Sequence, residues 1–346
     1  MQGSENSGII SKNNLSSLRK KWMGILFLHA LLLAACYFLL DSQWESQSVY
    51  RWMGLAVFFS LFYFGFLWQR LELNHSPSST EILPKFGSGN LLTILRGMLL
   101  MLLAGFLLSQ RPQGWLAFLP GLLYALAALM DLFDGYFARI SNHQTKLGEE
   151  LDLSLDGLGI LVASLLLVQY GQVPYWYLLV GLARYLFVGG IWLRDRLGKP
   201  VYPLTENSAR RPFAGAQMGF AAVVLFPVFS PPGTFLAAAF FALPFLVGFL
   251  LDWFSVSGFT RRPWIKENYL LARCSAFLDS AQFMGMKHAL YKWIPLIIRT
   301  TLIVLLIIWL SINFLGVFES LNNPALNQHL PGRMPAFWSG SLLLLM

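Results

Sequence analysis

Long apolar runs separated by short polar segments dominate the chain, and each run is about 20 residues long, enough for a helix to cross about 30 Å of hydrocarbon. Hydrophobic residues make up 56% of the sequence and charged residues 12%, which excludes an ordinary soluble domain. The chain is expected to be an all-α polytopic membrane protein. Nine transmembrane helices are predicted, near residues 22–40, 52–68, 91–109, 115–133, 153–170, 174–193, 213–230, 234–252 and 293–315.

Lysine and arginine are unevenly distributed along the chain, and their distribution predicts its orientation. The chain has 25 basic and 17 acidic residues and a net charge of +8. Positively charged loops stay on the cytoplasmic side, so the N-terminus and the loops at 139–146, 194–211 and 261–287 are predicted to be cytoplasmic. No aromatic and basic nucleic-acid-binding module accompanies the charge. We therefore expect membrane lipids as partners and no nucleic acid.

Six of the 17 carboxylates lie between residues 131 and 156, in an otherwise apolar region. Ionisable groups at membrane depth are costly and tend to mark functional sites. Asp131 and Asp134 are three residues apart, so on a helix they share a face. Asp152 and Asp156 are four apart and do the same. Carboxylates brought together need cations to neutralise them, and Mg²⁺ or Mn²⁺ suits such hard oxygen ligands. The spacing predicts a divalent-metal site.

Two glycines and an arginine accompany the aspartates. Gly135 and Gly148 remove side-chain bulk, which would let a diphosphate or a nucleotide approach the backbone closely. Arg139 offers a planar guanidinium suited to phosphate oxygens. The segment therefore predicts a phosphate-bearing substrate beside the metal site.

The whole segment reads D-x2-D-G-x2-A-R-x8-G-x3-D-x3-D, with Ala138 as its alanine. In this form it resembles the signature of the CDP-alcohol phosphotransferases, a family of integral membrane enzymes. Eight positions agree in identity and spacing, far more than in a short glycine motif. The resemblance covers roughly residues 88 to 255.

Looser similarities extend the resemblance. Asn90 to Arg96 is similar to the N-x-x-T-x-x-R opening of the family's first core helix, with Thr93 as its threonine. Arg96 itself has two interpretations, a side chain that snorkels to the headgroups or a substrate contact. Downstream, Arg184 and the run that holds Arg210 and Arg211 resemble an arginine-bearing helix and the basic approach to the next one. Tyr185 stands where bacterial phosphatidylglycerophosphate synthases commonly carry an acidic residue, which leaves the acceptor alcohol open.

The resemblance implies a reaction of the EC 2.7.8 type. A phosphatidyl or other phospho-alcohol group would move from a CDP-activated donor, expected to be CDP-diacylglycerol, to the hydroxyl of a polar acceptor, with release of CMP. Asp156 would be the catalytic base. Two divalent ions, Mg²⁺ or Mn²⁺, would be held by Asp131, Asp134, Asp152 and Asp156. The donor nucleotide would be contacted by Asn90, Thr93, Gly135, Ala138, Arg139 and Gly148, and candidates for an acceptor phosphate are Arg184, Arg210 and Arg211.

The resemblance also implies a division of the chain around a six-helix catalytic core at 90–255. A polar N-terminus (1–21), two extra transmembrane helices (22–68) and a linker (69–89) precede the core. A cytoplasmic interfacial segment (256–291) and one extra C-terminal transmembrane helix with a tail (292–346) follow it.

Dimers are common in the family, so a homodimer is an expectation from the family alone. Compact loops favour a prokaryotic inner membrane, with the active site facing the cytoplasm.

Two other functional classes use similar residues. An intramembrane prenyltransferase also binds a diphosphate through Mg²⁺ and aspartates, but its two acidic motifs lie far apart, whereas Asp134 and Asp152 are 18 residues apart. A transporter would be expected to show repeat symmetry, and no internal repeat is visible. Because all four aspartates are intact, a non-catalytic relative is disfavoured. Glycerol 3-phosphate, an inositol phosphate or an unphosphorylated alcohol stay open as the acceptor.

Overall fold

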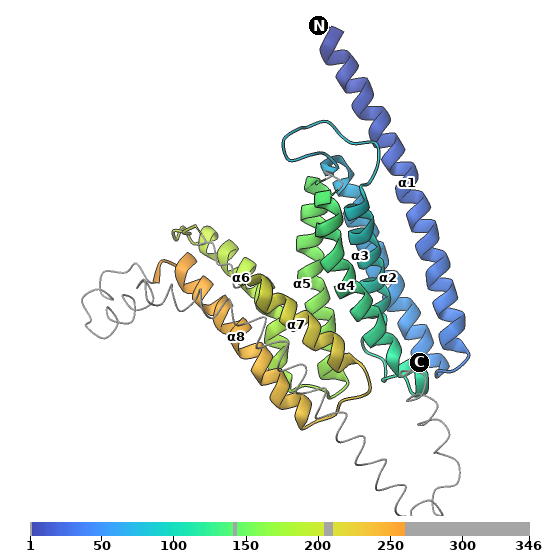
Figure 1. The fold of residues 1–346 in the computed structure, drawn as a ribbon, viewed down its shortest axis with the longest axis vertical. Coiled ribbons are helices and arrows are strands. Elements are labelled where there is room, and N and C mark those ends of the chain that lie inside the picture. The colour runs from blue at the N-terminus through green and yellow to red at the C-terminus, as the bar shows by residue number, and fades with distance from the viewer. Residues whose placement is uncertain (1, 141–143, 204–209, 260–346) are drawn as a thin grey trace, which may run out of the picture. The chain divides into compact units, whose positions relative to one another are not determined.

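The computed structural model describes residues 2–140, 144–203 and 210–259; for residues 2–11, 135–140 and 210–211 it describes the backbone alone. All regular elements in this part of the chain are helical (Figure 1). Short 3₁₀ turns lie at Leu71–Leu73, Gly114–Phe118 and Tyr175–Tyr177. The α-helices are α1 (Gln2–Asp41), α2 (Ser46–Arg70), α3 (Ser88–Ala104), α4 (Leu119–Ile140), α5 (Lys146–Gln169), α6 (Leu178–Arg196), α7 (Arg210–Leu225) and α8 (Gly233–Val256).

The membrane architecture is confirmed within the described residues. Six segments are long and apolar enough to cross a bilayer, and they contain most of α1, α2, α4, α5, α6 and α8. Helices α3 and α7 are apolar but shorter, with 17 and 16 residues. These helices correspond to the first eight predicted spans. The predicted span at 293–315 and nearly all of the predicted interfacial segment lie outside the described residues.

Helix α3 lies at the centre of the packing. It packs against α2, α4 and α5, which run beside it as the neighbouring blue and green helices of Figure 1. Its C-terminal half, from Met98 to Ala104, is buried. Around this group, α6 packs on α5 and α8, and α7 packs on α4, α5 and α8. Because other helices surround α3, its polar side chains face protein partners and not lipid.

The segment between α2 and α3, predicted as a linker, is held by hydrogen bonds at several points. The N–H of Leu83 donates to the carbonyl of Asn74 at 2.8 Å, which closes residues 74–83 into a loop. The N–H of Lys146, at the start of α5, donates to the carbonyl of His75 at 3.1 Å. On the α1 side, Nδ2 of Asn14 donates to the carbonyl of Ile82 at 2.8 Å. Residues 74–87 therefore connect α1, α2, α3 and the start of α5.

Candidate active site

Helix α5 carries two of the four predicted aspartates on a face set by its leucines. Leu147, Leu151 and Leu155 follow one another at four-residue intervals and are at most 2% exposed. Asp152 and Asp156 each come one residue after a buried leucine, which rotates them by about 100° around the helix. Burial of the leucine stripe therefore orients both carboxylates toward α3 and α4.

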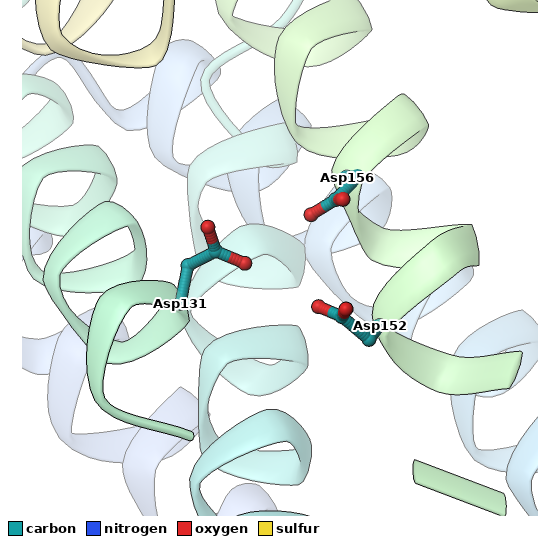
Figure 2. A group of neighbouring side chains, drawn as sticks. All are labelled: Asp131, Asp152 and Asp156. Atoms are coloured by element: carbon teal, nitrogen blue, oxygen red, sulfur yellow. The ribbon is translucent and has the colours of Figure 1, made fainter. Parts of the chain in front are cut away.

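Three of the four predicted aspartates converge. Asp131 on α4 and Asp152 and Asp156 on α5 each offer a carboxylate oxygen, and these oxygens lie within 4.8 Å of one another. Figure 2 shows the three side chains pointing into one space between the two helices. We call Asp131, Asp152 and Asp156 the carboxylate cluster.

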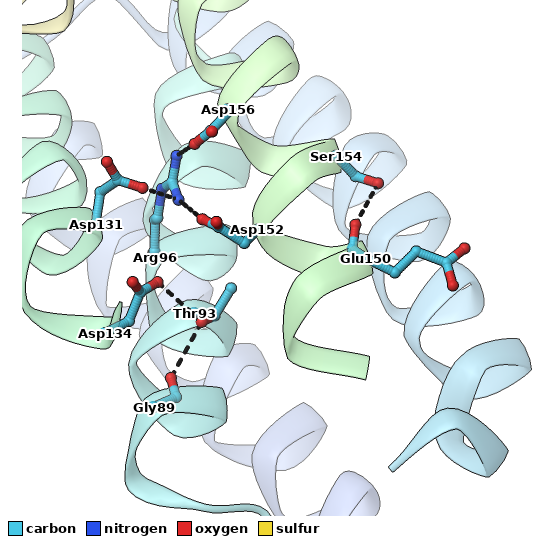
Figure 3. A network of polar contacts seen from close by, with 9 residues as sticks. All are labelled: Gly89, Thr93, Arg96, Asp131, Asp134, Glu150, Asp152, Ser154 and Asp156. Carbon is cyan, nitrogen blue, oxygen red and sulfur yellow. Dashed lines mark hydrogen bonds and ion pairs between the residues drawn. The ribbon is translucent and has the colours of Figure 1, made fainter. Parts of the chain in front are cut away.

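Arg96 on α3 reaches into the carboxylate cluster. Its side chain is 1% exposed, and its guanidinium forms ion pairs with Asp131, Asp152 and Asp156, the pair to Asp152 at 2.9 Å (Figure 3). Of the two interpretations from sequence, snorkelling to the headgroups is wrong, because the side chain is buried among carboxylates. A buried guanidinium is stabilised by this pairing, since an isolated buried charge would be costly.

Asp134 lies to one side of the carboxylate cluster. It is 7% exposed and is not part of the group whose oxygens converge. Its Oδ2 lies 2.9 Å from the hydroxyl of Thr93, which also lies 3.1 Å from the carbonyl of Gly89 (Figure 3). Thr93 and Arg96 are three residues apart and share a face of α3, so this one face meets both aspartates of α4. A metal-binding role for Asp134 stays a prediction.

A second, uncharged network joins Asn74, Asn90 and Thr145, which we call the amide network. Nδ2 of Asn90 donates to Oδ1 of Asn74 at 3.0 Å and to Oγ1 of Thr145 at 2.8 Å. Thr145 is the N-cap of α5, and its Oγ1 accepts the N–H of Gly148 at 3.1 Å. A Cβ on Gly148 would lie 2.5 Å from Oδ1 of Asn90, so the glycine lets α5 approach α3 at this point.

The remaining predicted residues are distributed over three helices. Arg184 on α6 packs against α5, since its Cδ lies 2.7 Å from where a Cβ on Gly157 would be, one residue after Asp156. Gly135, Ala138 and Arg139 continue α4, and Arg210 and Arg211 begin α7; their side chains lie outside the described part. Their contacts with substrate stay predictions.

The carboxylate cluster fits a divalent cation. Its three side chains are 22% exposed at Asp131, 46% at Asp152 and 39% at Asp156, so an ion can reach them. Carboxylate oxygens are the ligands that Mg²⁺ and Mn²⁺ prefer. Among the described side chains, the ion pairs of the cluster are all made with Arg96, whose single positive charge leaves an excess of negative charge for a cation to neutralise.

Arg96 and Asn74 were absent from the predicted site residues. For Arg96 a signal was present, because a charged residue three positions after Thr93 on an apolar helix must face protein or water, and Thr93 belonged to the predicted site. For Asn74 no such signal was present in the sequence. It lies 16 residues before its partner Asn90, in a stretch whose serines and prolines are typical of a loop.

Comparisons with known proteins find a family and several relatives. Residues 87–251 match the family model described as CDP-alcohol phosphatidyltransferase. A CDP-diacylglycerol--glycerol-3-phosphate 3-phosphatidyltransferase from Cereibacter sphaeroides is 33% identical over 143 residues, which cover 39% of this chain and 61% of the relative. The enzyme of the same name from Bacillus subtilis is 36% identical over 72 residues, 21% of this chain and 37% of the relative.

A Mycobacterium tuberculosis protein, by its name a provisional cardiolipin synthase, is 28% identical over 140 residues, 39% of this chain and 63% of the relative. The chain thus spans about three fifths of the length of these first relatives. No solved structure matches it significantly. The matched region includes the carboxylate cluster and Arg96, and it excludes α1, α2 and most of the segment between α2 and α3. Residues 87–251 of this chain are therefore similar to the CDP-alcohol phosphatidyltransferase family.

Proposed function

We propose that the chain transfers a phosphatidyl group from CDP-diacylglycerol to the hydroxyl of a polar alcohol and releases CMP. The observation that carries the proposal is the convergence of Asp131, Asp152 and Asp156 within 4.8 Å inside a family-matched membrane domain. A diphosphate donor is strongly anionic, so a site built from carboxylates needs divalent cations to bind it.

The residues of the site have separate tasks in this reaction. Divalent ions bound by Asp131, Asp152 and Asp156, with Asp134 beside them, would neutralise the donor's phosphate oxygens. Asp156 takes the proton of the acceptor hydroxyl while the hydroxyl oxygen attacks the donor's β-phosphorus. The bond from that phosphorus to the bridging oxygen breaks, and CMP leaves. Arg96 keeps the three carboxylates oriented toward one point, which is the positioning that such a transfer requires.

We propose glycerol 3-phosphate as the acceptor. Several relatives carry this alcohol in their names. Arg184 supports the proposal, because it packs on α5 beside the residue that follows Asp156 and so offers a guanidinium for an acceptor phosphate near the proposed base. Arg210 and Arg211 at the start of α7 would add to that attraction.

We place the site on the cytoplasmic side of a bacterial plasma membrane. The relatives named above are bacterial proteins. The basic residues of the loops around the site, read with the positive-inside rule, support this orientation. A lipid donor can then enter from the bilayer while its CDP group stays in water.

The test is CMP release by the purified chain in detergent with Mg²⁺ and CDP-diacylglycerol. Glycerol 3-phosphate, inositol 1-phosphate and glycerol are offered separately as acceptors. Asp156→Asn should abolish acceptor-dependent release, because the amide cannot take a proton. Asp41→Asn, at the exposed end of α1, is the matched control and should keep full activity.

The acceptor is decided by the same panel. Release that depends on glycerol 3-phosphate and fails with glycerol would support the proposed acceptor. CMP release with glycerol and not with glycerol 3-phosphate would contradict the proposed acceptor but would still support the reaction class. Folded protein that neither binds CDP nor releases CMP with any alcohol would contradict the class itself.

A further inference from the structure

The segment from Asn74 to Phe86 lies outside the family-matched region, yet its first residue contacts the first core helix. Asn74 is 0% exposed, Asn90 is 3% exposed and Thr145 is 2% exposed. Buried amides are costly unless their hydrogen bonds are satisfied. The amide network therefore has to form as a unit for this part of the chain to pack.

The two amide groups are used almost completely within the network. Nδ2 of Asn74 donates to the carbonyls of Leu83 at 3.0 Å and Lys85 at 3.1 Å, while its Oδ1 accepts from Asn90. Asn90 spends its two amide hydrogens on Asn74 and Thr145, and its Oδ1 lies 3.2 Å from the donating hydroxyl of Thr145. No amide hydrogen of Asn90 is left for a ligand.

The network ends at the helix that carries two of the clustered aspartates. Thr145 caps α5. The next residue, Lys146, donates its N–H to the carbonyl of His75, which directly follows Asn74. Asp152 and Asp156 lie about two and three turns further along this helix. A helix is stiff over that length, so fixing its first turn fixes the direction in which both carboxylates point.

We propose that Asn74 is a positioning residue of the active site. Through Asn90 and Thr145, the segment that begins at Asn74 sets the orientation of α5 and with it the geometry of the carboxylate cluster. Asn90, expected from the family resemblance to contact the donor, then acts through Thr145 and not on the nucleotide. The proposal rests on the proposed function, since it concerns the same site.

The test is a double-mutant cycle with two readouts. Wild type, Asn74→Ala, Asn90→Ala and the double variant are compared by CMP release and by Mn²⁺ affinity, the latter from the electron paramagnetic resonance signal of free Mn²⁺. Partners that orient metal ligands typically change affinity or activity by about 10-fold or more. We expect each single variant to lose about 10-fold in both readouts, and the double variant to lose little more than either single one, because the two residues share one interaction.

Asn14→Ala is the matched control. It removes an asparagine that holds the same segment from the α1 side, through the carbonyl of Ile82, without contact to Asn90. It should leave both readouts within about twofold of wild type. If Asn74→Ala does not yield folded protein, Asn90→Ala carries the test, since it breaks the link from Asn74 to Thr145 and leaves the hydrogen bonds of Asn74 to Leu83 and Lys85 in place.

Opposite results would overturn the proposal. Near-wild-type Mn²⁺ affinity and CMP release in folded Asn74→Ala would do so, as would additive losses in the cycle. Near-wild-type Mn²⁺ affinity in folded Asn90→Ala would also count against it. Wild type that binds Mn²⁺ but releases no CMP would contradict the proposed reaction alone, and the Mn²⁺ arm would still decide the role of Asn74. Wild type without Mn²⁺ binding would overturn both.

Discussion

Helix α3 contributes to two polar networks that differ in burial and in how completely their hydrogen-bonding groups are satisfied. In the amide network every member is at most 3% exposed, and its hydrogen-bonding groups meet each other or the backbone. At the carboxylate cluster only the side chain of its partner Arg96 is as buried, at 1%, whereas Asp152 and Asp156 are 46% and 39% exposed. Figure 3 shows these carboxylates meeting around the guanidinium.

The difference separates structural from chemical roles. A saturated neutral network has no group left for a ligand, so it can hold helices in place and do little else. The carboxylate cluster keeps oxygens that are open to solvent and more negative charge than Arg96 can balance. Ion binding is therefore expected at the cluster, and sensitivity to small changes in packing is expected at the amide network. Four substitutions test this contrast.

The largest effect is expected from Asp152→Asn. The change keeps the size of the side chain but removes one negative charge from the cluster. We expect CMP release and Mn²⁺ affinity to fall together by about 100-fold or more, since even partners that only orient a ligand contribute 10- to 100-fold. Mn²⁺ titration and CMP release in detergent measure both. Loss of activity with unchanged Mn²⁺ affinity would show that Asp152 does not hold the ion.

Arg96→Gln should lower stability by about 3 kcal/mol, because it leaves three clustered carboxylates without their buried partner. Mg²⁺ should raise the thermal unfolding temperature of this variant more than that of wild type, because the ion then supplies the missing positive charge. Unfolding scans with and without Mg²⁺ measure the difference. Equal Mg²⁺ stabilisation in both proteins would argue that the ion does not bind at the cluster.

Gly148→Ala tests the amide network without removing a hydrogen-bonding group. The new Cβ would lie 2.5 Å from Oδ1 of Asn90, and overpacking of this kind costs about 1–3 kcal/mol. Gly219→Ala on α7 is the matched control, because a Cβ there meets nothing within 4 Å. The control should gain up to about 1 kcal/mol of stability from helix propensity. Similar unfolding temperatures for the two variants would contradict the close approach of α5 and α3.

The smallest effect is expected at Arg70 and Glu150, an ion pair at 2.5 Å between α2 and α5 that lies outside both networks. The two side chains are 37% and 33% exposed, so solvent screens the pair, and its loss should cost less than about 1 kcal/mol. Arg70→Gln should therefore unfold close to wild type and keep its Mn²⁺ affinity. If Arg70→Gln lost as much stability as Arg96→Gln, a partly exposed ion pair would contribute as much as the buried guanidinium at the cluster, which would contradict the comparison.

Much of the fold could be predicted from local patterns. Apolar runs of membrane length indicated eight helices that the structure contains, because hydrocarbon thickness fixes the length of a span whatever its neighbours are. The boundaries were less accurate. Helix α2 begins at Ser46 and α3 ends at Ala104, against predicted spans of 52–68 and 91–109. Whether a residue at a helix end belongs to the helix depends on capping contacts, which cannot be predicted from hydrophobicity.

The candidate site was predictable only where its residues are close in sequence. The spacing of Asp152 and Asp156 was sufficient to place both on one face of a helix. That Asp131 joins them while Asp134 turns to Thr93 could not be predicted, since it depends on how α4 rotates against α3. Asp131 and Asp134 are both fixed positions of the sequence motif, so the motif alone does not distinguish their roles.

The sequence by itself determined the membrane-spanning helices and the helix faces that the aspartates share, while the phosphate-transfer chemistry was implied by the resemblance of the motif to a known family. The helices and the shared faces follow from composition and from spacing along single helices, which depend on the helical repeat alone. Only the tertiary structure decided that Arg96 enters the carboxylate cluster and that Asn74, ahead of the family-matched region, is joined through Asn90 to the cap of α5. These contacts join residues 16 to 60 positions apart. Such pairs are selected by the packing of several helices at once, because a buried polar group must find whichever partner that packing brings near.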